Sequence, residues 1–97
     1  MMMKDLDKKR LAEIGGRIRK VREEGGLNLH ELARLCGISA PALSLIETGK
    51  RDLRATSLCR IAAALRVAAG DLIDNREDKS RARAAGKRSG YELRDYT

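Results

Sequence analysis

No apolar run in this sequence approaches the roughly 20 residues that a helix needs to span a bilayer. The first residues, Met-Met-Met-Lys-Asp-Leu-Asp, also lack the apolar core of a secretory signal. From these two absences we expect the protein to stay in the cytoplasm and to have no membrane partner.

Residue types that carry catalysis or bind metals are also scarce. Cys36 and Cys59 have no Cys or His neighbour at metal-ligand spacing, so we expect both to be small buried apolar residues. The single histidine, His30, has no metal-ligand partner at i+4. We expect it to be exposed and to have no function, the alternative being contact with a phosphate. A glycine-rich phosphate loop, a His-Glu-x-x-His motif and a catalytic carboxylate pair are missing. We therefore expect no enzyme activity, no cofactor and no metal.

Basic residues are in excess. The 97 residues include 21 Lys and Arg against 14 Asp and Glu, a formal net charge of +7 that favours an anionic partner. The excess is +2 in residues 1–10, +2 in 11–74 and +3 in 75–97. We expect a basic N-terminal extension or helix start over 1–10, one small domain over 11–74 and a basic, flexible tail over 75–97.

Apolar residues in the first part of the domain recur at spacings of three and four, which predicts an amphipathic helix that ends near Gly25: Leu11, Ile14, Ile18 and Val21. The same spacing predicts a later helix: Leu58, Ile61, Ala62 and Leu65. Leu72 and Ile73, after Gly70, predict a short last helix. No strand pattern is found, so the fold class is all-α.

Two further helix patterns lie between Asn28 and Gly49. Asn28 and Glu31 have the spacing of a capping box, and Leu27 with Leu32 that of a hydrophobic staple. These signals predict a helix from about Asn28 to Gly37.

The same signals repeat directly after Gly37. Ser39 is a cap residue, Ile38 and Leu43 form the next staple pair, and Pro41 lies in the first turn, where a missing N–H costs little. A helix over 39–48 that ends before Gly49 follows. Two short capped helices joined by a glycine are typical of a helix-turn-helix.

The spacing of many residues resembles that of phage repressor and Cro-type (XRE family) helix-turn-helix domains, over roughly Ile14 to Ile73: Leu32, Ala33, Gly37, Ser39, Ser44, Ile46, Glu47, Gly49, Ile61, Ala62 and Leu65. The resemblance implies a compact five-helix, lambda-repressor-like DNA-binding domain. It implies that the helix over 39–48 lies in the major groove of double-stranded DNA, and that a homodimer binds two half-sites about one helical turn apart. Dimer candidates are Leu72 and Ile73.

The resemblance also implies a structural brace between Arg22 and Glu47. Such a pair would hold the groove-facing helix at a fixed angle, and a forked guanidinium has donors left for a phosphate. The alternative for Arg22 is a solvated surface charge.

The chain departs from the family at the side that would face the groove. Ala40, Pro41, Ala42 and Leu45 cannot make bidentate hydrogen bonds to bases, although Ala and Leu can contact the methyl group of thymine. The hydroxyls of Ser44 and Thr48 remain, so we expect modest direct readout.

Backbone contacts are expected on both sides of that helix. Leu29 stands where relatives often carry a glutamine that contacts the sugar-phosphate backbone of DNA. Without that glutamine, the Asn28 side chain and nearby backbone N–H groups are the expected phosphate contacts on that side. Lys50, Arg51 and Arg54 are candidates on the other side, the alternative being a loop whose charges only keep it solvated. The expected DNA-binding residues are Arg22, Asn28, Leu29, Ser39, Ala40, Pro41, Ala42, Ser44, Leu45, Thr48, Lys50, Arg51 and Arg54.

Two hypotheses follow. The first is a transcriptional regulator that binds operator DNA as a homodimer. The second is a protein-interaction module, antitoxin-like or antiactivator-like, in which Leu29, Ala40, Ala42 and Leu45 form an apolar docking surface. In the tail, we expect Tyr91, Leu93 and Tyr96 to dock on a protein partner or on the second subunit, the alternative being a tail that only adds non-specific DNA affinity.

Overall fold

The computed structural model describes residues 4–74, and the expected docking segment with Tyr91, Leu93 and Tyr96 lies outside them. Within this range the chain forms helices only: α1 (Asp5–Glu24), α2 (Leu29–Cys36), α3 (Ala40–Glu47), α4 (Ala55–Leu65) and α5 (Ala69–Ile73). The all-α fold with five helices is confirmed. No helix in this part of the chain is long and apolar enough to cross a membrane.

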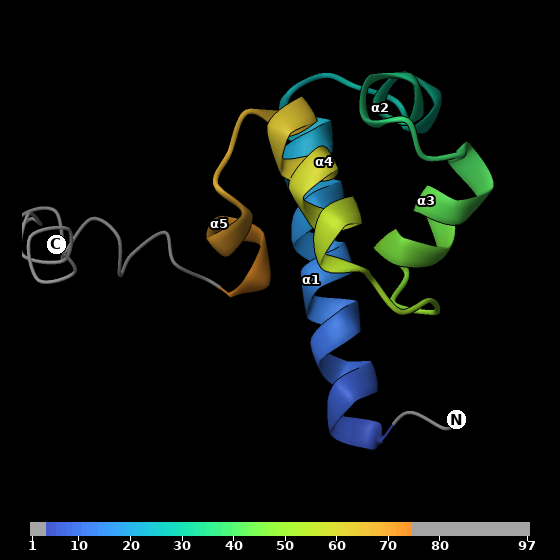
Figure 1. Cartoon of the computed structure of the whole chain (residues 1–97), viewed down its shortest axis with the longest axis vertical. Coiled ribbons are helices and arrows are strands. Elements are labelled where there is room, and N and C mark those ends of the chain that lie inside the picture. Colours follow the sequence, from blue (N-terminus) through green and yellow to red (C-terminus); the bar gives the residue numbers. More distant parts are fainter. Residues whose placement is uncertain (1–3, 75–97) are drawn as a thin grey trace, which may run out of the picture.

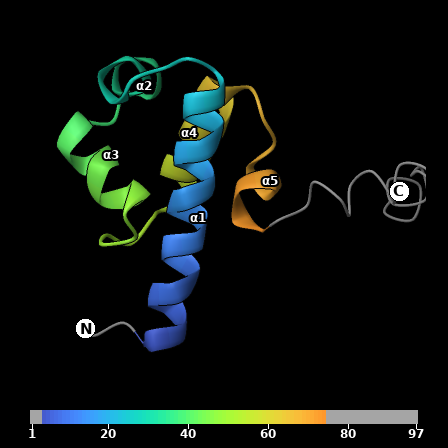
Figure 2. The ribbon, with the colours of Figure 1, turned by 180° about the vertical axis from the view of Figure 1, so that it is seen from behind.

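α1 is the longest helix, and the others pack around it. Figures 1 and 2 show α2 and α3 on one side of α1, α5 on the other side, and α4 against its length. α1 begins at Asp5, so residues 5–10 are the first turns of this helix. Asp5 and Asp7 lie in the first turn, where carboxylates interact favourably with the helix dipole.

Each helix contributes one completely buried aliphatic side chain to the core. They are Ile18, Leu32, Leu43, Ile61 and Leu72, from α1 to α5 in order. Because all five helices meet at one cluster, the position of each depends on the others. The core holds α2 and α3 against α1 and α4 as one unit.

The expectation that both cysteines are buried is half wrong. Cys36 is buried, whereas Cys59 is exposed. The buried positions of α4 are Leu58, Ile61 and Ala62, and a residue next to Leu58 points about 100° away from it around the helix. Cys59 therefore faces solvent, although it lies between the core residues Leu58 and Ile61 in the sequence.

α5 also differs slightly from its expected position. It begins at Ala69, so Gly70 lies inside the helix and not before it. Leu72 is completely buried, and Ile73 is 50% exposed. Consecutive helical residues face different directions, so Leu72 belongs to the core and Ile73 is the exposed one of the two dimer candidates.

Candidate nucleic-acid interface

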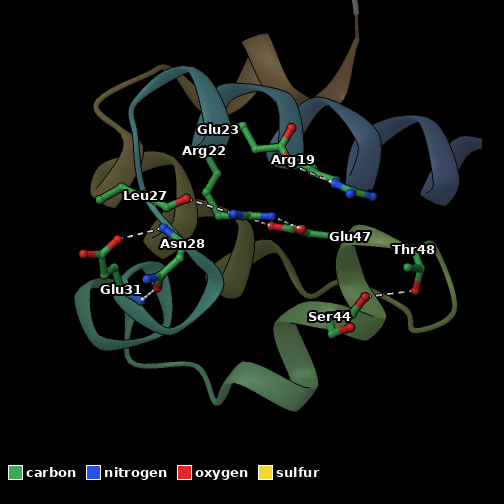
Figure 3. A network of polar contacts seen from close by, with 9 residues as sticks. All are labelled: Arg19, Arg22, Glu23, Leu27, Asn28, Glu31, Ser44, Glu47 and Thr48. Carbon is green, nitrogen blue, oxygen red and sulfur yellow. Dashed lines mark hydrogen bonds and ion pairs between the residues drawn. The ribbon is translucent and has the colours of Figure 1, made fainter.

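The turn between α2 and α3 is built by local hydrogen bonds. The Asn28 carboxamide oxygen accepts a hydrogen bond from the Glu31 N–H at 2.8 Å, and the Glu31 carboxylate accepts one from the Asn28 N–H at 2.7 Å (Figure 3). α2 ends at Gly37, which has a φ of 73°. Ser39 then caps α3, with its hydroxyl oxygen 3.3 Å from the Ala42 nitrogen. These bonds satisfy donors that helix starts leave free.

α3 buries one side and presents the other to solvent. Leu43, Ile46 and Glu47 are buried. The exposed residues recur at helical spacing on the opposite side: Pro41, Ser44, Leu45 and Thr48. Ala40 and Ala42 are half-buried between the two sides. Of the groove-facing residues expected from the sequence, four thus form one exposed stripe.

The two hydroxyls of this stripe are not equivalent. The Thr48 hydroxyl lies 2.9 Å from the Ser44 carbonyl oxygen (Figure 3). It also lies 3.2 Å from the Leu45 carbonyl oxygen. Its single O–H proton is therefore used inside α3, and Thr48 can only accept from a partner. No such bond occupies the Ser44 hydroxyl within the described chain. Ser44 can both donate to and accept from a base edge.

Arg22 and Glu47 join the end of α1 to the end of α3. Arg22 Nε lies 2.7 Å from one carboxylate oxygen of Glu47, Nη2 lies 3.0 Å from the other, and Nη1 lies 2.9 Å from the Leu27 carbonyl oxygen (Figure 3). Each residue is only 9% exposed. The hydrogen bond to Glu47 raises the pKa of the Arg22 guanidinium above its usual value, against the lowering effect of burial.

Arg22 is thus a buried partner of Glu47 and not a solvated charge. All three guanidinium nitrogens have acceptors inside the protein, and little of the side chain reaches the surface. The geometry favours the brace over the phosphate contact that was also expected of Arg22.

Gly15 lets α1 and α3 approach closely, which the sequence analysis missed. A Cβ at Gly15 would lie 2.6 Å from the Glu47 carbonyl oxygen and closer still to that of Ile46. Just beyond α3, Gly49 has a φ of 73°, and a Cβ there would lie 2.6 Å from the Ala12 Cα. The signal in the sequence is a glycine between core positions of a long helix.

The loop after α3 carries exposed cations. Lys50, Arg51 and Arg54 are exposed, and Arg54 is the N-cap residue of α4, whose first turn has no side-chain cap. Next to α3 the loop borders a hollow of about 220 Å³, which is lined by Ile38, Ala42, Ile46, Arg51, Asp52, Leu53, Arg54 and Ser57. Arginines, a hydroxyl and uncapped N–H groups together are suited to a phosphate.

The start of α2 has fewer hydrogen-bond donors free for a DNA phosphate than expected from the sequence. Asn28 is exposed, but its carboxamide oxygen and its backbone N–H are both used in the capping box. Its side-chain NH₂ remains as a donor. Leu29 is half-buried and packs against the core, and His30 is exposed. This side of α3 therefore has one free donor group from Asn28, against three cations on the other side.

Arg17 has a structural role that the sequence analysis also missed. Its Nη1 lies 2.8 Å from the Ile73 carbonyl oxygen and 3.2 Å from that of Leu72. Arg17 thus satisfies carbonyl groups at the end of α5, which helix ends leave without partners, and ties α5 to α1. A basic residue between core positions of a helix gives no sign of such a distant acceptor.

The capped α2 and α3 helices, joined by an αL glycine and held on α1, define a helix-turn-helix protein. The chain belongs to the helix-turn-helix family (HTH_3), whose sequence model matches residues 18–72. This agrees with the Cro/C1-type resemblance of the sequence. A comparison with curated protein sequences gives no match.

Solved structures support the assignment. The restriction-modification controller protein C.AhdI from Aeromonas hydrophila is 29% identical with a TM-score of 0.63, over 64% of this chain and 94% of that one. The hypothetical transcription factor NHTF from Neisseria is 26% identical with a TM-score of 0.67, over 84% and 89% of the two chains. The SinR–SinI protein complex matches at 27% identity and a TM-score of 0.62, over 86% and 89%.

Proposed function

We propose that the protein is a transcriptional regulator that binds double-stranded DNA with α3 in the major groove. The observation that carries the proposal is the exposed stripe of α3, which lies beside a basic loop and is held in place by the buried Arg22–Glu47 pair. Similar structures include a restriction-modification controller protein and a hypothetical transcription factor. Family membership points to a regulator and not to an enzyme, and a DNA partner implies action in the cytoplasm.

In this proposal the contacts divide into positioning and readout. Lys50, Arg51 and Arg54 would bind phosphates on one side of α3, and Asn28 on the other. Ser44 and Leu45 would contact base edges, with Ala40 and Pro41 close to the backbone at the start of the helix. Because the readout side chains are few and small, discrimination between sequences should be modest.

We infer a homodimer on two half-sites from the same family pattern. Ile73 supports this assignment because it is an apolar side chain that is 50% exposed at the end of the short α5. Arg17 holds the carbonyl end of that helix. The dimer would place two copies of α3 about one helical turn apart along the DNA.

The second candidate is a protein-interaction module. One structural neighbour is a complex of two proteins, SinR and SinI. However, Leu29, Ala40 and Ala42 are half-buried, so Leu45, at 42% exposure, is the one exposed residue of the expected apolar docking surface. This small apolar area favours the DNA-binding proposal.

Replacement of Leu45 separates the two candidates. On DNA, Leu45→Ala should weaken binding several-fold at sites with a thymine opposite α3, because it removes an apolar contact. The control is Leu35→Ala, which truncates a leucine of 60% exposure on α2. If Leu45→Ala leaves DNA binding unchanged and weakens a protein complex, the interaction module is correct.

The first experiment is anisotropy binding to DNA upstream of the protein's own gene and to a scrambled duplex, each at several salt concentrations. A preference on the order of 10³-fold or more is the range of specific recognition. Dependence on protein concentration, with sedimentation of the complex, reports the dimer. Equal, steeply salt-dependent binding to both duplexes would contradict sequence-specific regulation.

A further inference from the structure

The first turns of α1 project beyond the rest of the bundle. In Figures 1 and 2 the N-terminal end of α1 extends past the ends of the other helices. Residues 4–10 are all exposed and include four basic and two acidic side chains. They precede residues 18–72, which the family model matches, so the match assigns them no role.

One face of this projection continues the contact between α1 and the end of α3. Gly15 touches the carbonyl groups of Ile46 and Glu47, and Ala12 touches the backbone of Gly49. Lys8 precedes Ala12 by four residues, and Ala12 precedes Gly15 by three. Residues at these spacings share one face of a helix. Lys8 is therefore the next position along the face that already touches Gly49.

This placement puts Lys8 close to the basic loop. Lys50 and Arg51 directly follow Gly49, and Lys8 lies four residues before Ala12 along α1, a rise of about 6 Å. Phosphates on one DNA strand are spaced by about 3.4 Å along the axis. A lysine side chain at this distance beyond the loop is close enough to reach a phosphate that neighbours those the loop would bind.

Lys8, Lys50 and Arg51 are not engaged in ion pairs within the described residues and can therefore bind an anion. Among residues 4–74, ion pairs join Arg19 to Glu23 and Arg22 to Glu47, and neither includes Lys8, Lys50 or Arg51. Asp5 shares the Lys8 face and reduces its net charge. It also lies in the first turn of α1, where the helix dipole favours a carboxylate.

We propose that Lys8 binds a phosphate of the DNA backbone beside the one that Lys50 and Arg51 bind, which extends the interface onto the projecting end of α1. The proposal rests on the proposed DNA-binding function. Its partner is the sugar-phosphate backbone that flanks the bases facing α3, so the contact is independent of base sequence. Lys8 increases affinity and adds no sequence preference.

The test measures the salt dependence of binding to a random-sequence 24-base-pair duplex by fluorescence anisotropy, with the full chain. Lys8→Gln should reduce the slope of log K against log salt by about 0.9 per bound subunit, the value for one lost phosphate contact. The matched control is Arg10→Gln, which removes the same charge from the opposite face, two residues along the helix. It should leave the slope unchanged. Equal melting temperatures of both variants and the wild type exclude an effect on folding.

The other outcomes are distinct. An equal reduction in both variants would mean general attraction by net charge and would overturn the Lys8 contact. An unchanged slope for Lys8→Gln together with a reduced slope for Arg51→Gln would overturn the Lys8 contact and leave the DNA-binding proposal intact. No binding of the wild type to any duplex at low salt would overturn both proposals.

Discussion

Arg22 and Glu47 are the two charged side chains that the described part of the fold buries. Burial of an ion pair costs desolvation energy, which the attraction offsets only with good geometry and further hydrogen bonds. Here the contact is bidentate, and the Leu27 carbonyl oxygen accepts a hydrogen bond from the third guanidinium nitrogen of Arg22. Such a pair gives little net stability, but removal of one partner leaves a buried charge alone.

Arg22→Met should therefore reduce the free energy of unfolding by about 3–5 kcal/mol. The control, Arg19→Met, breaks an exposed pair with Glu23 and should cost less than about 0.5 kcal/mol. Urea denaturation of both variants checks this. Since Arg22→Met can fail to fold, the double variant with Glu47→Met should recover much of the lost stability. A double variant no more stable than Arg22→Met would contradict the argument.

The two hydroxyls of α3 permit a second test at single residues. Ser44→Ala should weaken DNA binding several-fold, because it removes a group free to pair with a base edge. Thr48→Val should have a smaller effect, since the Thr48 proton is already bonded to carbonyl groups of α3. Anisotropy titrations with one duplex compare the two variants. A larger loss for Thr48→Val would show that its intrahelical bond breaks on DNA.

At the scale of helices, α1 and the end of α3 approach closely through backbone, in addition to the core contacts of Ile18 with Leu43 and Ile46. Gly15 leaves room for the carbonyl groups at the end of α3, and Gly49 leaves room for Ala12. This contact lies at the same end of α3 as the Arg22–Glu47 pair. Together they set the distance and the angle between the two helices, and so the direction in which the stripe of α3 faces.

Gly15→Ala should destabilise the protein by about 1–3 kcal/mol, because the new methyl group would overlap backbone carbonyl groups, which shift less easily than the end of a side chain. Gly16→Ala, one residue later, has nothing within 4 Å of the new Cβ. It should stabilise α1 by about 0.5–1 kcal/mol through helix propensity. Thermal and urea denaturation measure both changes. Stabilisation by both substitutions would show that α1 and α3 are further apart.

At the scale of the molecule, exposed cations lie at one end of α3 while the core holds that helix in place. Replacement of Arg51 and Arg54 by alanine should weaken binding to all duplexes alike and reduce the salt slope by about 0.9 for each lost contact. Arg66→Ala is the control, because Arg66 lies at the opposite end of α4 from Arg54. Binding that loses sequence preference and keeps its salt slope would contradict a phosphate role.

Much of the helix-turn-helix was predictable because its signals are local. The capping box of Asn28 and Glu31, the Ser39 cap and the αL glycines at positions 37 and 49 each act within a few residues. The start of α1 at Asp5 was not specified, since residues 5–10 have no apolar stripe, and residues 1–10 fitted either an N-terminal extension or the start of the helix. The DNA contacts of individual residues remain predictions.

Local sequence signals are enough to specify where α2 and α3 begin and end and which side of each is apolar, because capping hydrogen bonds and the rotation per residue act within one or two turns. Residues whose partners are far along the chain take their positions only from the packing of the helices against one another. This packing buried Arg22 against Glu47, gave Arg17 the carbonyl groups of α5, and separated buried Leu72 from exposed Ile73. These outcomes depend on how five helices share one core, and no local pattern specifies that packing.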